Sequence, residues 1–323
     1  MRKRTLALSA GLAVAAALAL SQTGAARAPA APAPGTVAFL ATPSRPDAVA
    51  SEVRLVEVTA GADPIVKELF RFEVPHAPGA VVRGDVLAGG RAVVVAADEA
   101  FAGEPDFGAA LHRVDAGGTR VLARGLYHAS RPLVSSDGSV YVERGSSGAW
   151  PTRDEARAGR LRTDTLTLDA IDAATGAVRN VATWNGYTMH VAGELGGELV
   201  VYRVAYEGAD LVMLDRNSGR VRSVATLLPF ARDFSIDRAR GAVVMSNRDE
   251  QDSRLWVVDR IDLATGVRER LHRQRDLAPV PYLTSDGDVR WSTTAAPAMP
   301  DAPFVARLAA AGERVEPLGG GLR

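Results

Sequence analysis

Aromatic, histidine and charged side chains recur at four places along this sequence, each time in a segment that leads into a short apolar run. If these segments converged, the aromatic rings would form apolar walls and the charged groups would supply polar contacts, which is the usual composition of a binding pocket. Alternatively, the aromatic rings fill space and the charges are solvated. The candidate binding residues are Tyr127, His128, Arg131, Tyr187, His190, Arg232, Asp233 and Tyr282.

The common sequence signatures of catalysis do not occur in this chain. It has no Gly-x-Ser-x-Gly nucleophile elbow, no His-Glu-x-x-His zinc helix, no phosphate loop, no Gly-x-Gly-x-x-Gly and no EF-hand calcium loop. The histidines lie far apart, without the spacing of metal ligands. We therefore expect no catalytic residue, no metal site and no cofactor, and these absences favour binding over turnover.

A repeated phrase indicates how the candidate residues are positioned. An apolar run ends in Asp, a short turn follows, and a second run begins; the phrase occurs at Asp115, Asp172, Asp215 and Asp262. These aspartates are 57, 43 and 47 residues apart, and strand-built repeats of roughly 40–50 residues are typical of β-propellers. Glycine follows each Asp because a tight hairpin needs positive φ, and we expect the Asp to cap its turn.

One segment carries the repeat most fully. It reads Ser235-Ile-Asp-Arg-Ala-Arg-Gly241, then an apolar strand, Ser246-Asn-Arg-Asp249, and a second apolar strand that ends at Asp259. This resembles the repeat of TolB-like, WD40-like (PD40-type) six-bladed propellers, with Ile236 in place of the usual proline. The resemblance covers Thr36 to about Leu318. TolB also carries an N-terminal α/β domain that nothing here could supply, so a role in the Tol system does not transfer.

We expect an all-β propeller of six four-stranded blades, with seven as the alternative. Five repeats are complete, and residues 36–74 supply three strands of a sixth; the last repeat comprises Val280–Thr284, Asp288–Ser292, Phe304–Leu308 and Glu313–Leu318. A closed ring should bring the N-terminal strand beside the C-terminal blade, because closure leaves no open sheet edge. The candidate binding residues then lie at the channel mouth, where an outer strand leads into the next innermost strand.

The start of the chain has the layout of a secretory signal peptide. Basic residues at 2–4 precede an apolar run from Leu6 to Leu20, and small residues follow to Ala28. The expected organisation is a signal peptide over 1–28, a Pro/Ala-rich linker over 29–35 and the propeller domain over 36–323. We expect a periplasmic or secreted protein with no integral membrane segment after cleavage. The 38 basic and 38 acidic residues balance, so nucleic acid is not an expected partner.

The expected function is non-catalytic binding of an envelope or extracellular protein, or of a small ligand, at the channel mouth. The alternative is a propeller-type hydrolase or lactonase, for which Asp85, Glu194 and Asp233 are the acids near that rim. A quinone-dependent dehydrogenase fits less well, because the four tryptophans fall at different places in the repeat. Two acidic loop clusters, Asp98–Asp106 and Asp249–Asp252, could hold a cation or a basic partner, although solvated loop charge is the default.

Overall fold

The structure is a computed structural model that describes most of the chain from residue 36 onward, and every regular element in it is a β-strand. The described residues are 36–41, 48–59, 65–77, 82–87, 89–99, 108–126, 130–145, 164–205, 207–229, 231–275, 278–283, 289–292, 306–310 and 313–315. The expected signal peptide and linker lie outside these residues. Within the described ranges, no helix has the length and apolar character needed to cross a bilayer.

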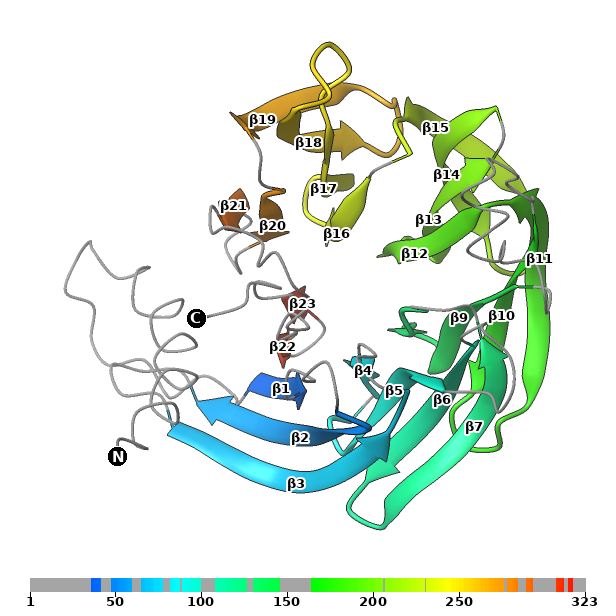
Figure 1. Cartoon of the computed structure of the whole chain (residues 1–323), viewed down its shortest axis with the longest axis vertical. Coiled ribbons are helices and arrows are strands. Elements are labelled where there is room, and N and C mark those ends of the chain that lie inside the picture. Colours follow the sequence, from blue (N-terminus) through cyan, green and yellow to red (C-terminus); the bar gives the residue numbers. More distant parts are fainter. Residues whose placement is uncertain are drawn as a thin grey trace.

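Four consecutive segments each form a four-stranded antiparallel sheet in which the strands pair in chain order. The strands are β4 (Val82–Val86), β5 (Ala92–Glu99), β6 (Gly108–Asp115) and β7 (Gly118–Leu126); β8 (Leu133–Val134), β9 (Ser139–Gly145), β10 (Asp164–Asp172) and β11 (Val178–Gly186); β12 (Thr188–Leu195), β13 (Glu198–Ala205), β14 (Gly208–Asp215) and β15 (Val221–Leu227); and β16 (Arg232–Asp237), β17 (Ala242–Arg248), β18 (Leu255–Asp262) and β19 (Arg268–Arg275). The sheets follow one another around a central axis, with β4, β12 and β16 innermost and β7, β15 and β19 at the rim (Figure 1). This arrangement confirms the expected all-β propeller architecture.

The remaining strands correct one part of the prediction. We expected Phe304–Leu308 and Glu313–Leu318 to pair with the strands near residues 280–292. Instead β20 (Val280–Leu283) and β21 (Val289–Ser292) form a two-stranded sheet, while β22 (Ala306–Ala310) pairs with β1 (Thr36–Ala41) and β23 (Glu313–Val315) extends that sheet. β2 (Ala50–Thr59) and β3 (Ile65–Pro75) complete it. The partner assignment was wrong because the open edge of β1 recruits β22, but the expected contact between chain ends is confirmed.

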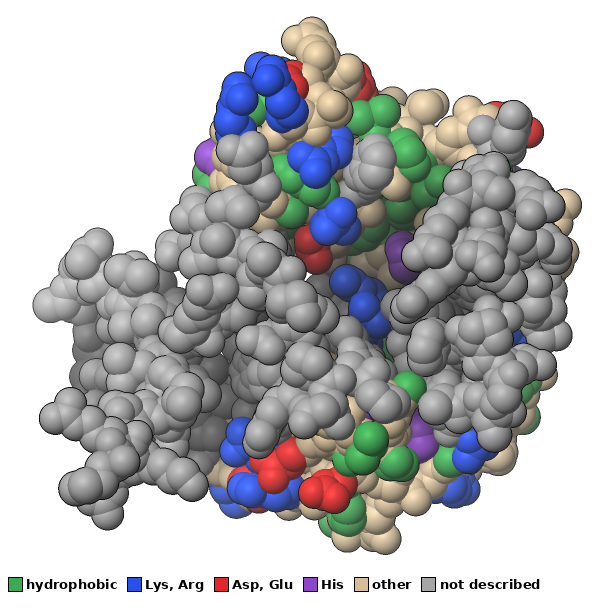
Figure 2. All heavy atoms as spheres, in the orientation of Figure 1, with side chains coloured by type: hydrophobic (Ala, Val, Ile, Leu, Met, Phe, Trp, Pro, Cys, Tyr) green, Lys and Arg blue, Asp and Glu red, His purple; other side chains and the backbone are tan. Residues whose placement is uncertain are grey.

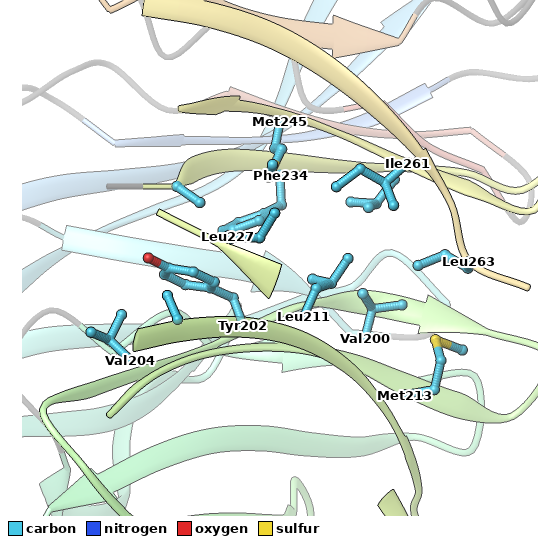
Figure 3. Packing of buried hydrophobic residues seen from close by; sticks show 13 residues of the cluster. Val200, Tyr202, Val204, Leu211, Met213, Leu227, Phe234, Met245, Ile261 and Leu263 are labelled. Carbon is cyan, nitrogen blue, oxygen red and sulfur yellow. The ribbon is translucent and has the colours of Figure 1, made fainter. Parts of the chain in front are cut away.

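Side chains packed between successive sheets form the core. In Figure 3, Tyr202, Leu211 and Leu227 of one sheet face Phe234 and Met245 of the next, and all five are buried. Three further clusters fill the spaces between other neighbouring sheets. The outer strands are largely exposed, as in β7 and β15. Because both faces of this inner strand are covered, β17 is buried at six successive residues, Ala242 to Asn247, rather than at alternate ones.

The repeated aspartates cap their turns, as expected. Asp172 Oδ1 accepts the backbone N–H groups of Ala174 and Thr175, and Asp262 Oδ1 accepts those of Ala264 and Thr265. Hydrogen bonds from the Thr175 backbone and hydroxyl lower the pKa of Asp172. These aspartates are therefore structural groups and not candidates for acid–base chemistry.

The capped turns also contact the preceding sheet. Arginines near the rim donate to backbone carbonyls in the next turn: Arg113 to Ala173, Arg179 to Arg216, and Arg222 to Leu263. The turn approaches so closely at Gly266 (φ 74°) that a Cβ there would lie 2.3 Å from the carbonyl oxygen of Val224.

Replacement of Gly266 by Ala should therefore destabilise the fold more than replacement of Gly241, its matched control. Gly241 also has positive φ (62°), but a Cβ there meets no atom within 4 Å. We expect Gly241→Ala to lower the free energy of unfolding by about 1–2 kcal/mol, and Gly266→Ala by a further 1–3 kcal/mol or so because of the contact. Urea denaturation measures both, and equal losses would contradict the close contact between sheets.

A proline in β1 should open the ring. Ala38 pairs with Val56 of β2 on one side and with Leu308 of β22 on the other, and proline cannot serve in a strand paired on both sides. We expect Ala38→Pro to lower the melting temperature by about 5 °C or more, with Ala38→Val as the strand-compatible control. A melting temperature equal to that of the control would argue against closure at β1.

Candidate functional site

The innermost strands of four successive sheets surround a cavity of about 170 Å³. Its lining comes from β4, from the residues that lead into β8, and from β12 and β16, mostly at the end where these strands begin. Leu133 and Phe234 supply apolar wall. Arg83, Arg131, His190, Arg232 and Asp233 supply the charged and polar groups. Figure 2 shows basic, acidic and histidine side chains gathered around the hollow at the centre of the ring.

Four of the eight candidate binding residues meet in this axial cavity: Arg131, His190, Arg232 and Asp233. Tyr187 does not line it and packs instead against the core beside β13 and β14. Tyr127 and His128 lie outside the described residues, as does the side chain of Tyr282, whose backbone belongs to β20. Sequence reasoning missed Arg83, although this residue has the same position near the start of an innermost strand.

Two irregular strands shape the cavity. The pairing of β12 with β13 shifts between Val191 and Gly193, and the pairing of β16 with β17 shifts between Arg232 and Ser235. Such bulges place an extra residue in one strand and re-aim its side chains. Asp233 lies in the second bulge with φ 54°, a backbone conformation uncommon outside glycine. The bulges therefore occur where the lining residues must turn toward the axis.

The charged groups of the cavity come from separate sheets. Arg131 Nη2 lies 3.9 Å from Asp233 Oδ1, which is at the limit of an ion pair, and Ser246 Oγ donates to Asp233 Oδ2 at 3.4 Å. The Arg232 guanidinium lies over the ring of Trp256, 4.5 Å from its centroid. Burial lowers the pKa of Arg232; Asp233 opposes this shift, whereas the positive charges of Arg248 and Arg131 add to it.

His190 is a neutral member of the site. Burial, with the positive charges of Arg131 and Arg83, lowers the pKa of His190 to about 3. Its ring stacks on Tyr202 with 6.4 Å between centroids, and Nε2 lies 3.5 Å from Thr188 Oγ1. At neutral pH the imidazole thus adds polarity without adding charge.

The buried carboxylate of Glu143 lies behind the cavity and holds two of its walls together. Its Oε2 accepts the Ser130 hydroxyl at 2.5 Å and the Arg131 backbone N–H at 3.2 Å, while its Oε1 accepts the Val191 backbone N–H at 2.8 Å. Burial raises the pKa of Glu143 despite these hydrogen bonds. Glu143 therefore fixes the backbone on which Arg131 and His190 are carried.

The acids considered for catalysis serve structural roles in two of three cases. Asp85 accepts the backbone N–H groups of Val86 and Val134, at 2.8 and 2.7 Å. Glu194 accepts from Ser135, Ser136 and Arg216, and these contacts lower its pKa although burial opposes the shift. Among the residues that the structure describes, no group of three His, Asp or Glu side chains could hold a metal ion.

One member of the second acidic cluster, Asp249, is not solvated loop charge. Asp249 is buried and accepts from Arg270 Nη1 at 2.8 Å and Arg273 Nη2 at 2.6 Å. Burial opposes ionisation of Asp249, but the Gln251 backbone N–H and Arg273 outweigh it and lower the pKa to about 2. The default expectation was therefore wrong for Asp249. In the first cluster, the side chains of Asp98, Glu99, Glu104 and Asp106 lie outside the description.

Two larger hollows lie away from the axis. One of about 590 Å³ lies among the hairpin turns of two sheets and includes Asp115, Asp137 and Asp172, whose carboxylates already cap turns. The other, of about 330 Å³, includes Trp184 and Arg203, and Arg203 is paired with Asp210. The axial cavity differs from both because its lining comes from the innermost strands of four sheets.

Comparison with solved structures finds proteins with a similar fold. No protein-family model and no curated protein sequence matches this chain. TolB from Acinetobacter baumannii superimposes with a TM-score of 0.54 and 14% identity, over 87% of this chain and 62% of that one. Oligogalacturonate lyase from Vibrio parahaemolyticus gives 0.51 and 10% identity, over 87% and 78% of the chains. A structure of oligogalacturonate lyase in complex with manganese gives 0.50 and 11%, over 84% and 75%.

These likenesses concern the fold. Identities of 10–14% do not carry an activity from one chain to another, and this chain spans 62% of the TolB chain. The sheet order, the capped repeats and the matched structures nevertheless agree with one another. The chain has the β-propeller fold of the TolB-like proteins, as its repeat indicated.

Proposed function

We propose that this protein is an exported, non-catalytic β-propeller that binds a protein or small-molecule partner at the axial cavity. The observation that carries the proposal is the convergence of Arg131, His190, Arg232 and Asp233 from three sheets on one axial hollow. A hollow that combines apolar wall with a few convergent polar and charged groups is the usual composition of a binding site. Asp85 and Glu194, by contrast, are occupied by the fold itself.

The N-terminal sequence supports a proposal about the cellular setting. The basic start and the apolar run to Leu20 favour export, with a signal peptide over 1–28, a linker over 29–35 and the propeller over 36–323. We propose a periplasmic or secreted protein whose partner belongs to the bacterial cell envelope. Six blades are the count that the described sheets favour, with β20 and β21 belonging to the last of them.

A propeller-type hydrolase or lactonase is the alternative, and its structural support is limited to the lyases that share the fold. The described part of the chain offers Asp233 as the acid in the cavity, but it lacks a metal-holding group of side chains beside it. The described lining gives Asp233 no second carboxylate with which to divide the general-acid and general-base roles of a hydrolase. Binding is therefore the better-supported function.

Removal of the two arginines should weaken partner capture. We expect Arg131→Ala/Arg232→Ala to reduce recovery of envelope components in a pull-down by roughly tenfold or more, with little change in melting temperature because both side chains are partly exposed. The matched control is Arg220→Ala/Arg238→Ala. It removes the same charge from exposed turns at the opposite end of the ring.

Equal recovery by the wild type and the cavity variant would move the binding surface elsewhere. Equal loss in the cavity and control variants would show attraction by net charge alone and would also contradict the proposal. Ester or lactone turnover that disappears in Asp233→Asn would establish the enzyme alternative in its place.

A further inference from the structure

The axial cavity carries an excess of positive charge within a small volume. Among the described lining residues, Arg83, Arg131 and Arg232 are the basic groups and Asp233 is the acid. Arg131 and Asp233 approach to 3.9 Å, so their pairing is loose. Guanidinium groups that converge on one hollow repel one another, and an anionic group placed between them relieves that repulsion. The cavity therefore favours an anionic ligand over a neutral one.

Trp256 holds one of these arginines in place. Two guanidinium groups lie over its ring, that of Arg232 at 4.5 Å and that of Arg248 at 4.0 Å from the ring centroid. Trp256 is itself 4% exposed and is packed in β18. A guanidinium stacked on a fixed aromatic face keeps its N–H edge available for a ligand, since stacking uses only the face of the group.

Glu143 fixes the second arginine from behind. It binds the backbone N–H of Arg131 and that of Val191, which follows His190. The two arginines are thus supported on rigid elements, as binding sites require, and do not hang from free loops. His190 is neutral between them and adds no further charge.

The size of the cavity limits what can enter. A volume of about 170 Å³ is below the 300–1,000 Å³ or so of pockets that enclose drug-sized molecules. It admits one small group, with the remainder of the ligand outside. Because the Asp233 carboxylate lies in the same space, a singly charged group meets less repulsion there than a doubly charged one.

We propose that the axial cavity binds one carboxylate group of the ligand, between the Arg131 and Arg232 guanidiniums. The arginine forks donate to the two carboxylate oxygens, and Asp233 acts as an internal competitor that weakens binding of any further anion. This proposal rests on the proposed binding function and specifies its ligand chemistry. The carboxylate can belong to a small acid or to the end of a polypeptide.

Calorimetric titration of the purified protein with succinate tests the proposal, with neutral succinamide as the matched ligand. We expect succinate to bind and succinamide not to bind. Arg131→Ala/Arg232→Ala should weaken the binding of succinate at least about tenfold. Arg220→Ala/Arg238→Ala should leave the affinity for succinate unchanged. Asp233→Asn should increase the affinity for succinate about threefold or more. A variant that merely misfolds could not bind succinate more tightly. Asparagine also tolerates the backbone conformation of Asp233.

Two further ligand pairs identify the source and class of the anion. N-acetyl-trialanine with a free C-terminus, compared with its C-terminal amide, tells whether a polypeptide carboxylate enters the cavity as a small acid does. Inorganic phosphate should bind to the wild type more weakly than succinate does. Asp233→Asn should reduce the difference between the two affinities.

Three results would overturn the carboxylate assignment: equal binding of succinate and succinamide, tighter binding of phosphate than of succinate, or no effect of the double arginine variant on succinate. If succinate fails to bind while the double arginine variant still loses partner capture, the binding function stands and only the ligand assignment falls. If succinate binds as expected while partner capture is unchanged, the cavity site stands and the partner surface lies elsewhere.

Discussion

Among the described residues, neighbouring four-stranded sheets share no backbone ladder. The contacts that position one sheet against the next therefore depend on buried carboxylates that accept hydrogen bonds from the backbone of another sheet. Asp85 of β4 binds the N–H of Val134, Glu143 of β9 binds that of Val191, and Glu194 of β12 binds that of Ser136. Apolar packing between sheets is not directional. A charge-assisted hydrogen bond has defined geometry and therefore fixes the relative position of the inner strands.

The site depends on that geometry. Arg131 and His190 lie on different sheets, and Glu143 binds the backbone at or beside both. At the rim, arginine side chains link each sheet to the capped turn of the next. The ring is thus tied at its inner and outer radii, while the apolar core fills the space between. A rigid frame of this kind allows a small cavity to keep several like charges at fixed positions.

Local patterns in the sequence predicted the parts of the structure that local chemistry decides. The Asp and Gly turns were predictable because their hydrogen bonds close within a few residues. Convergence of Arg131, His190 and Arg232 followed from their equivalent places in the repeat, a criterion that also fits Arg83. The role of Asp85 was not predictable, because its partner Val134 lies 49 residues away and presents a backbone group. Likewise, the partner of β22 depends on which sheet has an open edge. The sequence near β22 carries no information about that edge.

The pairing of β1 with β22 joins residues from opposite ends of the chain, as between Val37 and Ala309. Contacts of such long sequence separation form late, because closing a long loop costs entropy that only later contacts offset. During synthesis, β1 emerges before β22 and must wait, with one edge unpaired, until β22 follows. Until then an exposed strand edge is open to pairing with other chains. The order in which the chain emerges therefore makes the first strand the last to be secured, and leaves it dependent on help from chaperones or on rapid completion of the chain.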